Sequence, residues 1–305
     1  MEKENQNENS RRNFLKGSLI AGAAATAAGA GLFSSCSKEE EVPTGAKVKL
    51  LSPDGKLVEV DSSHLQHCGA GAPPEEARKG IPGKKFVMVI DLSRCKHALK
   101  CEQACKAAHH LQPGQDWIKV FRMQDSKNTA PYWMPKPCMH CDNSPCQKVC
   151  PPGATFKRSD GIVLIDTERC IGCRFCMVAC PYSSRVFTWG KPDLPKEISE
   201  QPGSPETGFP PKMGTVSKCD FCPDLLKEGK LPHCVSACPN GVYYFGDINE
   251  DAVTNGDETL RFSELIRDKG GYRLYEHLGT RPSVYYLPPV HRIFPFKEAE
   301  EEGKS

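Results

Sequence analysis

One stretch, Cys170–Pro181 with the sequence CIGCRFCMVACP, decides the fold of this 305-residue chain. Three cysteines separated by two residues each can wrap their thiolates around one face of a cubane iron–sulfur cluster. The fourth cysteine follows three residues later, precedes proline, and directs its thiolate to the other cluster of a pair. The stretch therefore predicts two iron–sulfur clusters that exchange one ligand each.

Three further cysteine groups flank this stretch, and two of them also end in Cys-Pro. In chain order the four groups are Cys95, Cys101 and Cys105; Cys138, Cys141, Cys146 and Cys150; Cys170, Cys173, Cys176 and Cys180; and Cys219, Cys222, Cys234 and Cys238. They hold all but two of the 17 cysteines. Disulfide-rich proteins are usually short, so this density indicates metal. Zinc is the competing metal, but a zinc ribbon needs neither the third cysteine nor the Cys-Pro ending.

An internal repeat explains why the first group has only three members. The segment Ile90–Cys95 aligns with Ile165–Cys170, and the alignment continued without gaps places Ala98 opposite Cys173. The first group is therefore a ferredoxin-type run without its second ligand. A cubane corner that lacks a thiolate tends to lose its iron, so we expect a 3Fe–4S cluster at this site.

The exchange of ligands predicts how the thiolates are shared among four clusters. Each two-cluster unit should join a compact group to a spread group; the second and third groups are neighbours, and the first and fourth bracket them. The predicted ligand sets are Cys138, Cys141, Cys146 with Cys180; Cys170, Cys173, Cys176 with Cys150; Cys219, Cys222, Cys234 with Cys105; and Cys95, Cys101 with Cys238. The cofactor prediction is three 4Fe–4S clusters and one 3Fe–4S cluster.

The site with three thiolates has an alternative. A fourth 4Fe–4S cluster would form there if His97, Cys68 or a hydroxide held the last iron. We favour the simpler interpretation, in which His97 is a surface or hydrogen-bonding histidine and Cys68 a free thiol. No CxxCH motif occurs, so covalent haem is not supported.

The cysteine groups are joined by short apolar runs and loops rich in proline and glycine. We predict an α+β fold made of two ferredoxin-like two-cluster units, with short strands, short helices and long loops. The expected strands include Phe86–Asp91, Trp117–Met123, Ile162–Asp166 and Val242–Phe245.

The four-cluster domain should span 84–289, with one unit formed by 95–105 and 219–238 and the other by 138–180. Within it we expect a surface insertion at 190–214, and after it a polar tail at 290–305. Before it, residues 36–83 should form a linker with one small hairpin, Lys47–Leu51 and Leu57–Asp61, around Pro53–Gly55.

Residues 1–35 are typical of a twin-arginine export signal. Arg11–Lys16 has the order Arg-Arg-x-Phe-Leu-Lys and precedes an Ala/Gly-rich run that is too weakly apolar for a permanent anchor. This route carries folded proteins, which suits a cofactor inserted in the cytoplasm, and it places the protein on the periplasmic side.

Cys36 resembles a bacterial lipoprotein processing site, although Phe33 stands where such signals have an aliphatic residue. We expect lipidation at Cys36; cleavage elsewhere and a retained signal are the alternatives.

The remaining composition argues for a carrier of electrons. With 40 Lys+Arg against 38 Asp+Glu, the net charge of +2 excludes a basic nucleic-acid binder. No Ser/His/Asp pattern, phosphate-binding loop or isolated carboxylate pair stands out, so we predict no catalytic residues. Iron–sulfur clusters exchange single electrons, with potentials set by hydrogen bonds to sulfur, burial and nearby charge.

The chain resembles the four-cluster iron–sulfur subunits of the molybdopterin oxidoreductase family, which includes the polysulfide, tetrathionate, thiosulfate and dimethyl sulfoxide reductase types. The resemblance spans about 84–287 and rests on Cys138–Cys146 (CMHCDNSPC), Cys170–Cys173 (CIGC) and Arg281–Leu287 (RPSVYYL). It implies a non-catalytic subunit that carries electrons between a membrane quinone-reactive subunit and a molybdopterin catalytic subunit. Contact with the membrane would run through that partner or through lipid. Ala98 departs from the family pattern.

Three other interpretations stay open. The chain could be the iron–sulfur wire of a periplasmic hydrogenase. An enzyme could use the three-thiolate cluster as a Lewis acid, which requires a substrate cavity with bases over Ala98. A structural zinc protein would have no redox function.

Overall fold

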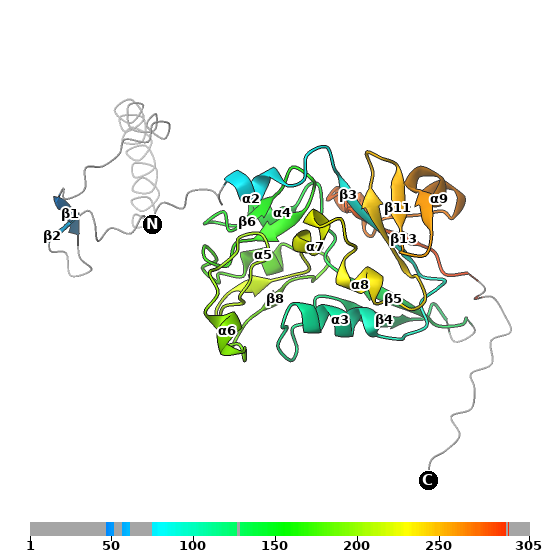
Figure 1. Ribbon diagram of the computed structural model, residues 1–305, viewed down its shortest axis with the longest axis horizontal. Helices are drawn as coiled ribbons and strands as arrows, with labels where there is room; N and C mark the ends of the chain where they lie inside the picture. Colours follow the sequence, from blue (N-terminus) through cyan, green and yellow to red (C-terminus); the bar gives the residue numbers. More distant parts are fainter. Residues whose placement is uncertain (1–46, 52–56, 62–74, 127–128, 291, 293–305) are drawn as a thin grey trace, which may run out of the picture. The chain divides into compact units, whose positions relative to one another are not determined.

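The computed structural model describes residues 47–51, 57–61, 75–126, 129–290 and 292 (Figure 1). The chain divides into two compact units, Met1–Gly69 and Ala70–Ser305. The export signal, Cys36 and Cys68 lie outside the described residues. In the first unit, β1 (Lys47–Leu51) and β2 (Leu57–Asp61) pair antiparallel, over the ranges expected from the sequence.

A five-stranded sheet forms one part of the second unit (Figure 1). Its strand order is β12-β11-β10-β3-β13. Its strands are β3 (Phe86–Asp91), β10 (Tyr243–Asp247), β11 (Ala252–Thr254), β12 (Thr259–Arg261) and β13 (Val284–Leu287). The central strand β3 pairs antiparallel with β10 and parallel with β13. Successive side chains point to opposite faces of a sheet, and every residue of β3 is buried, so both faces are covered.

The two faces of β3 serve two cores. Met88 and Ile90 pack into the large core that also contains most of the grouped cysteines. Val87 and Val89 face a smaller core, closed by Leu265 of α9 (Phe262–Asp268). The cysteine-bearing loops thus pack against the face of the sheet that carries Met88 and Ile90.

The cysteine-bearing part of the unit consists of short elements (Figure 1). Three two-stranded ribbons pair β4 (Lys119–Met123) with β5 (Tyr132–Lys136), β6 (Thr155–Lys157) with β7 (Val163–Ile165), and β8 (Val186–Phe187) with β9 (Val216–Ser217). The helices are α2 (Glu75–Lys79), α3 (Lys100–Ala108), α4 (Pro145–Lys148), α5 (Phe175–Val178), α6 (Lys196–Ser199), α7 (Pro223–Lys227) and α8 (His233–Ser236), with a 3₁₀ turn η2 at Glu276–Leu278. No helix in the described part of the chain has both the length and the apolar character needed to cross a bilayer.

The fold is mixed α+β with short elements, as the sequence predicts. The five-stranded sheet itself was not predicted, because its partners β3, β10 and β13 lie far apart in the sequence. Two predicted strands are shorter than expected: Trp117 and Ile118 are buried but precede β4, and Ile162 and Asp166 flank β7. About half of the insertion at 190–214 is exposed and nearly all of the rest is half-buried, and Phe209 packs against the ring of His110.

Candidate iron–sulfur centres

The fifteen grouped cysteines line four cavities of similar size, with volumes between about 280 and about 330 Å³. We name these cavities A to D. Cavity A is lined by Cys95, Cys101 and Cys238; B by Cys105, Cys219, Cys222 and Cys234; C by Cys138, Cys141, Cys146 and Cys180; and D by Cys150, Cys170, Cys173 and Cys176. The structure thus brings together the members of each ligand set expected from the exchange rule. All fifteen are free thiols.

Short helices divide the thiols between neighbouring cavities. Cys101 and Cys105 are both on α3, one helical turn apart, and line cavities A and B respectively. Cys234 on α8 lines B, and Cys238, four residues on, lines A. Residues four apart share one face of a helix. Because α3 packs against α8, the two helices connect A and B through four thiols.

The same arrangement connects C and D. Cys146 on α4 lines C and Cys150 lines D, whereas Cys176 on α5 lines D and Cys180 lines C. The helices α4 and α5 contact each other. The sequence spacing x3-Cys-Pro therefore has a direct structural meaning, since one helical turn separates the two cavities.

A buried histidine joins the two pairs. His140 lines cavity C, and its Nδ1 accepts a hydrogen bond from Val163 N at 3.0 Å. Its Nε2 must therefore carry the proton, which it donates to the carbonyl of Cys219, a residue of cavity B, at 2.9 Å. Burial lowers the pKa of His140 well below its usual value, so the ring stays neutral. The cavities follow one another in the order A, B, C, D.

The loops that carry the first cysteines are held in unusual backbone conformations. Gly172 has a φ of +69°, and a Cβ added there would lie 2.3 Å from the carbonyl oxygen of Gly214. Only glycine fits this close approach of two loops. Backbone N–H groups also point at sulfur, as where Thr155 N lies 3.4 Å from Cys150 Sγ. Such donors stabilise thiolate and cluster sulfur.

Burial strongly disfavours ionisation of the inner thiols. It raises the pKa of Cys141 and of Cys219 to about 12, and that of Cys105 and Cys222 further still. Neighbouring sulfurs add to the effect because several thiolates at one site repel one another. Groups of buried thiols that cannot ionise alone are suited to a cationic metal core, which offsets that repulsion. The donor set and the cavities thus fit iron–sulfur clusters.

Cavity A differs from the others at Ala98. This residue lines the cavity beside Cys95 and Cys101 and is exposed to solvent. His97 also lines it, and its ring is stacked on Trp133 with centroids 3.6 Å apart. The position without a thiol therefore lies at the protein surface.

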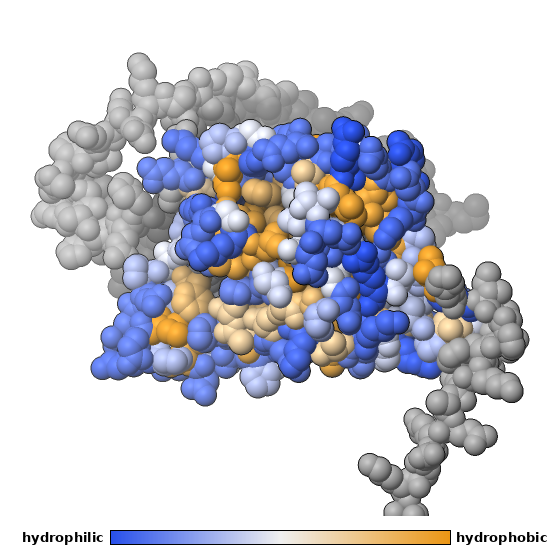
Figure 2. Space-filling view, turned by 45° about the vertical axis from the view of Figure 1, so that its right-hand side comes forward, coloured by the Kyte–Doolittle hydropathy of each residue, from blue (hydrophilic) through white to orange (hydrophobic). Residues whose placement is uncertain are grey.

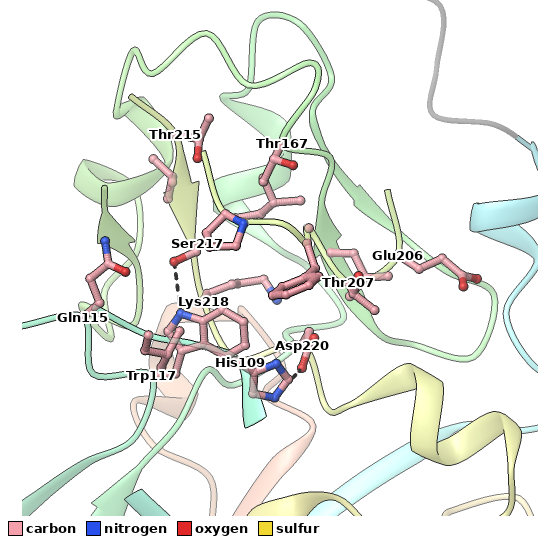
Figure 3. Close-up of a pocket in the computed structure, with 17 residues that line it drawn as sticks. His109, Gln115, Trp117, Thr167, Glu206, Thr207, Thr215, Ser217, Lys218 and Asp220 are labelled. Atoms are coloured by element: carbon pink, nitrogen blue, oxygen red, sulfur yellow. Dashed lines mark hydrogen bonds and ion pairs between the residues drawn. The ribbon is translucent and has the colours of Figure 1, made fainter. Parts of the chain in front are cut away.

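The contact of one histidine, His109, with a cysteine is not predicted by any sequence motif. His109 Nε2 lies 3.5 Å from Cys222 Sγ and 3.8 Å from an oxygen of Asp220. Both His109 and Asp220 also line a larger cavity of about 540 Å³, shown in Figure 3, where Trp117 donates a hydrogen bond to Ser217. Because His109 and Cys222 are 113 residues apart, no local spacing could have indicated this contact.

Comparison with known proteins agrees with this chemistry. Residues 129–197 and 209–248 match the 4Fe-4S dicluster domain, and residues 8–32 match the twin-arginine translocation pathway signal sequence. The chain is 37% identical to a selenate reductase subunit of Mesobacillus selenatarsenatis over 91% of this chain and 97% of that protein. It is 36% identical to a putative dimethyl sulfoxide reductase iron-sulfur subunit of Halobacterium salinarum, over 66% of this chain and 78% of that protein. It is 32% identical to a tetrathionate reductase subunit of Salmonella typhimurium, over 70% and 76% respectively.

Proposed function

Since this chain belongs to the ferredoxin-type iron–sulfur subunits of the molybdopterin oxidoreductase family, we propose that it relays electrons through clusters in cavities A to D. The relay connects a membrane quinone-reactive subunit with a molybdopterin catalytic subunit of a respiratory oxidoreductase. Each cluster, when bound, supplies reversible one-electron exchange. The chain itself holds, separates and tunes these groups.

The burial of the cysteines carries this proposal. All four cysteines of cavity B are buried, as are three of the four in cavity C. In cavity D three of four are only partly buried, and in cavity A two of three. The row A-B-C-D therefore has a shielded middle and two ends close to the surface, which is the arrangement that a wire between two partners requires.

The two ends differ in chemistry. Beside cavity D, Ile171, Phe175 and Val178 are exposed by 66%, 58% and 88%. Beside cavity A the exposed residues include Lys96 and Lys100. Elsewhere too, apolar residues interrupt a largely hydrophilic surface (Figure 2). A mainly apolar end that also exposes Arg174 and an end that exposes two lysines suit two different partner subunits.

The lining residues support a specific cofactor content. Cavities B, C and D each offer four thiols and would hold 4Fe–4S clusters, whereas cavity A offers three and would hold a 3Fe–4S cluster. The signal at 8–32 directs export by the twin-arginine route. We place the mature protein on the periplasmic side, with Cys36 as the candidate lipid anchor.

Native mass spectrometry of the chain, purified without oxygen from cells that build iron–sulfur clusters, tests the proposal. We expect the mass of three 4Fe–4S clusters and one 3Fe–4S cluster. Four complete cubanes would mean that another group holds the last iron, which would revive the Lewis-acid interpretation at Ala98. Zinc in place of iron and sulfide would overturn electron transfer altogether.

A further inference from the structure

Two buried polar side chains occupy matching positions in the two halves of the cluster-bearing domain. Arg185 follows Cys180 by five residues, and Tyr243 follows Cys238 by five residues. Both cysteines are the last of a Cys-Pro group. Neither residue belongs to a ligand set, yet each lies where two neighbouring cavities meet.

Arg185 lies between cavities C and D. It lines cavity C and is only 4% exposed. Its Nη1 donates a hydrogen bond at 3.1 Å to Thr155 Oγ1, and Thr155 lines cavity D. Its Nη2 is buried and has no oxygen or nitrogen partner among the described residues, so the guanidinium interacts instead with the thiols of Cys146 and Cys176.

The positive charge of Arg185 is also not paired with a carboxylate. No acidic side chain of the described chain forms an ion pair with it, although a buried and unpaired cation is costly. The thiols that act on it electrostatically are Cys146 and Cys138 of cavity C and Cys176 of cavity D. The negative charge that balances Arg185 must therefore come from the thiolate-bound clusters of cavities C and D.

Tyr243 has the corresponding place between cavities A and B. It lines cavity A and is 1% exposed. Among the described residues its hydroxyl has no oxygen or nitrogen partner and interacts instead with the thiol of Cys101. The thiols that act on it are Cys101 and Cys238 of cavity A and Cys234 of cavity B. A permanent cation, Arg185, thus lies between cavities C and D, whereas a neutral hydroxyl, that of Tyr243, lies between cavities A and B.

We propose that Arg185 is a positioning residue that raises the reduction potentials of the clusters in cavities C and D together, and that Tyr243 acts more weakly on those in A and B. This inference rests on the proposed electron relay. A cluster held by thiolates becomes more negative when it gains an electron, so a nearby cation stabilises its reduced form. Lying between two such groups, the guanidinium also offsets their mutual repulsion. Each transfer oxidises one cluster and reduces its neighbour by one electron, and no bond is broken.

Redox titration of the full chain, followed by electron paramagnetic resonance, tests the assignment. The signals of C and D are first identified with Cys146→Ser and Cys150→Ser. In Arg185→Gln the midpoint potentials of C and D should both fall, while those of A and B stay unchanged. Arg185→Lys should lower them less, since it keeps the charge.

Two further variants serve as matched controls. Arg174→Gln removes a cation that also lines cavity D but is exposed to solvent, so its effect on the potentials should be much smaller. Tyr243→Phe should lower the potentials of A and B only, by less than Arg185→Gln lowers those of C and D, because a hydroxyl dipole is weaker than a full charge.

Iron and sulfide are measured in every sample. Unchanged potentials in Arg185→Gln with full iron content would overturn the inference, as would an equal shift of all four clusters. If Arg185→Gln loses iron, Arg185→Met decides, because it removes the cation without leaving a buried amide unpartnered; a fall in potential confined to C and D supports the inference, and unchanged potentials with full iron content overturn it. A wild-type chain without iron and sulfide would instead defeat the proposed function, so the two failures are distinguishable.

Discussion

Leu99 and Arg174 adopt the same left-handed backbone conformation, with φ of 55° and 62°, and each immediately precedes a cysteine-bearing helix. Left-handed backbone is unfavourable for side chains of this kind, so its occurrence at matching positions of the internal repeat reflects a shared loop geometry. Asp91 and Asp166 match as well, because the Oδ1 of each accepts the backbone N–H two residues on, at 3.0 and 2.9 Å. This geometry puts Ala98 at the position that Cys173 holds in the other copy.

The Ala98→Cys variant should gain the missing iron. The new thiol would complete a four-thiol set in cavity A, so native mass should rise by one iron and the 3Fe–4S resonance should disappear. Because Ala98 is exposed, the free energy of unfolding should change by no more than about 0.5 kcal/mol. Ala98→Ser is the control and should leave the iron content unchanged. If the cysteine variant also keeps the wild-type iron content, the repeat alignment is wrong at this position.

Cys146→Ser and Cys150→Ser should affect different clusters, although the two residues are only four positions apart. The first removes a thiol of cavity C and the second a thiol of cavity D. Redox-titrated electron paramagnetic resonance should therefore show two different signals altered in the two variants. Loss of the same signal in both would contradict the exchange of ligands between the units.

Gly172→Ala should destabilise the loop of cavity D. Its left-handed backbone costs a side chain roughly 1–2 kcal/mol, and the new Cβ would also overlap the Gly214 carbonyl, which adds to that cost. We expect a lower melting temperature and loss of the cavity D signal. Gly190→Ala is a suitable control, because no atom lies within 4 Å of its added Cβ. Equal melting temperatures for the two variants would show that the close approach to Gly214 is unimportant.

Removing the clusters should destabilise the second unit as a whole. Most cysteines of cavities A, B and C lie in the large core, and without a bound metal the cysteines of B and C leave buried thiols around empty space. Treatment with an oxidant and a chelator should therefore lower the melting temperature and broaden the transition. The measurement is calorimetry before and after reconstitution with iron and sulfide; an unchanged melting curve would argue against clusters as part of the core.

Replacement of both Arg11 and Arg12 by lysine should stop export. The twin-arginine signal matches residues 8–32, and its recognition depends on the paired guanidinium groups. Fractionation should find the full-length precursor, with its clusters, retained in the cytoplasm. Lys16→Arg serves as the control, since it keeps the charge and leaves the arginine pair intact. Normal export of the double variant would assign translocation to another signal or to a partner.

Much of the chemistry is fixed locally and could be predicted. The spacing within Cys170–Cys180 indicates which thiols share one cavity and which crosses to the next, because one helical turn sets that geometry. The gap-free repeat likewise points to Ala98 as the missing ligand. The signal in the first 35 residues is also local and is matched at 8–32.

Other features depend on residues that meet only in the folded chain. The five-stranded sheet needs β3, β10 and β13, which are separated by most of the domain, and short apolar runs do not specify their partners. The same is true of His109 beside Cys222 and of Arg185 between cavities C and D. A lone histidine or arginine in a sequence carries no sign of what it will face.

The sequence by itself determined that the chain is of the iron–sulfur type and predicted the ligand groups and their exchange, since these depend on spacings of two to four residues along one loop or helical turn. Only the tertiary structure decided the order of the cavities, their unequal exposure at the two ends and the buried polar groups between them. Those properties arise from packing between segments far apart in the chain, and a spacing pattern contains no information about packing partners at that distance.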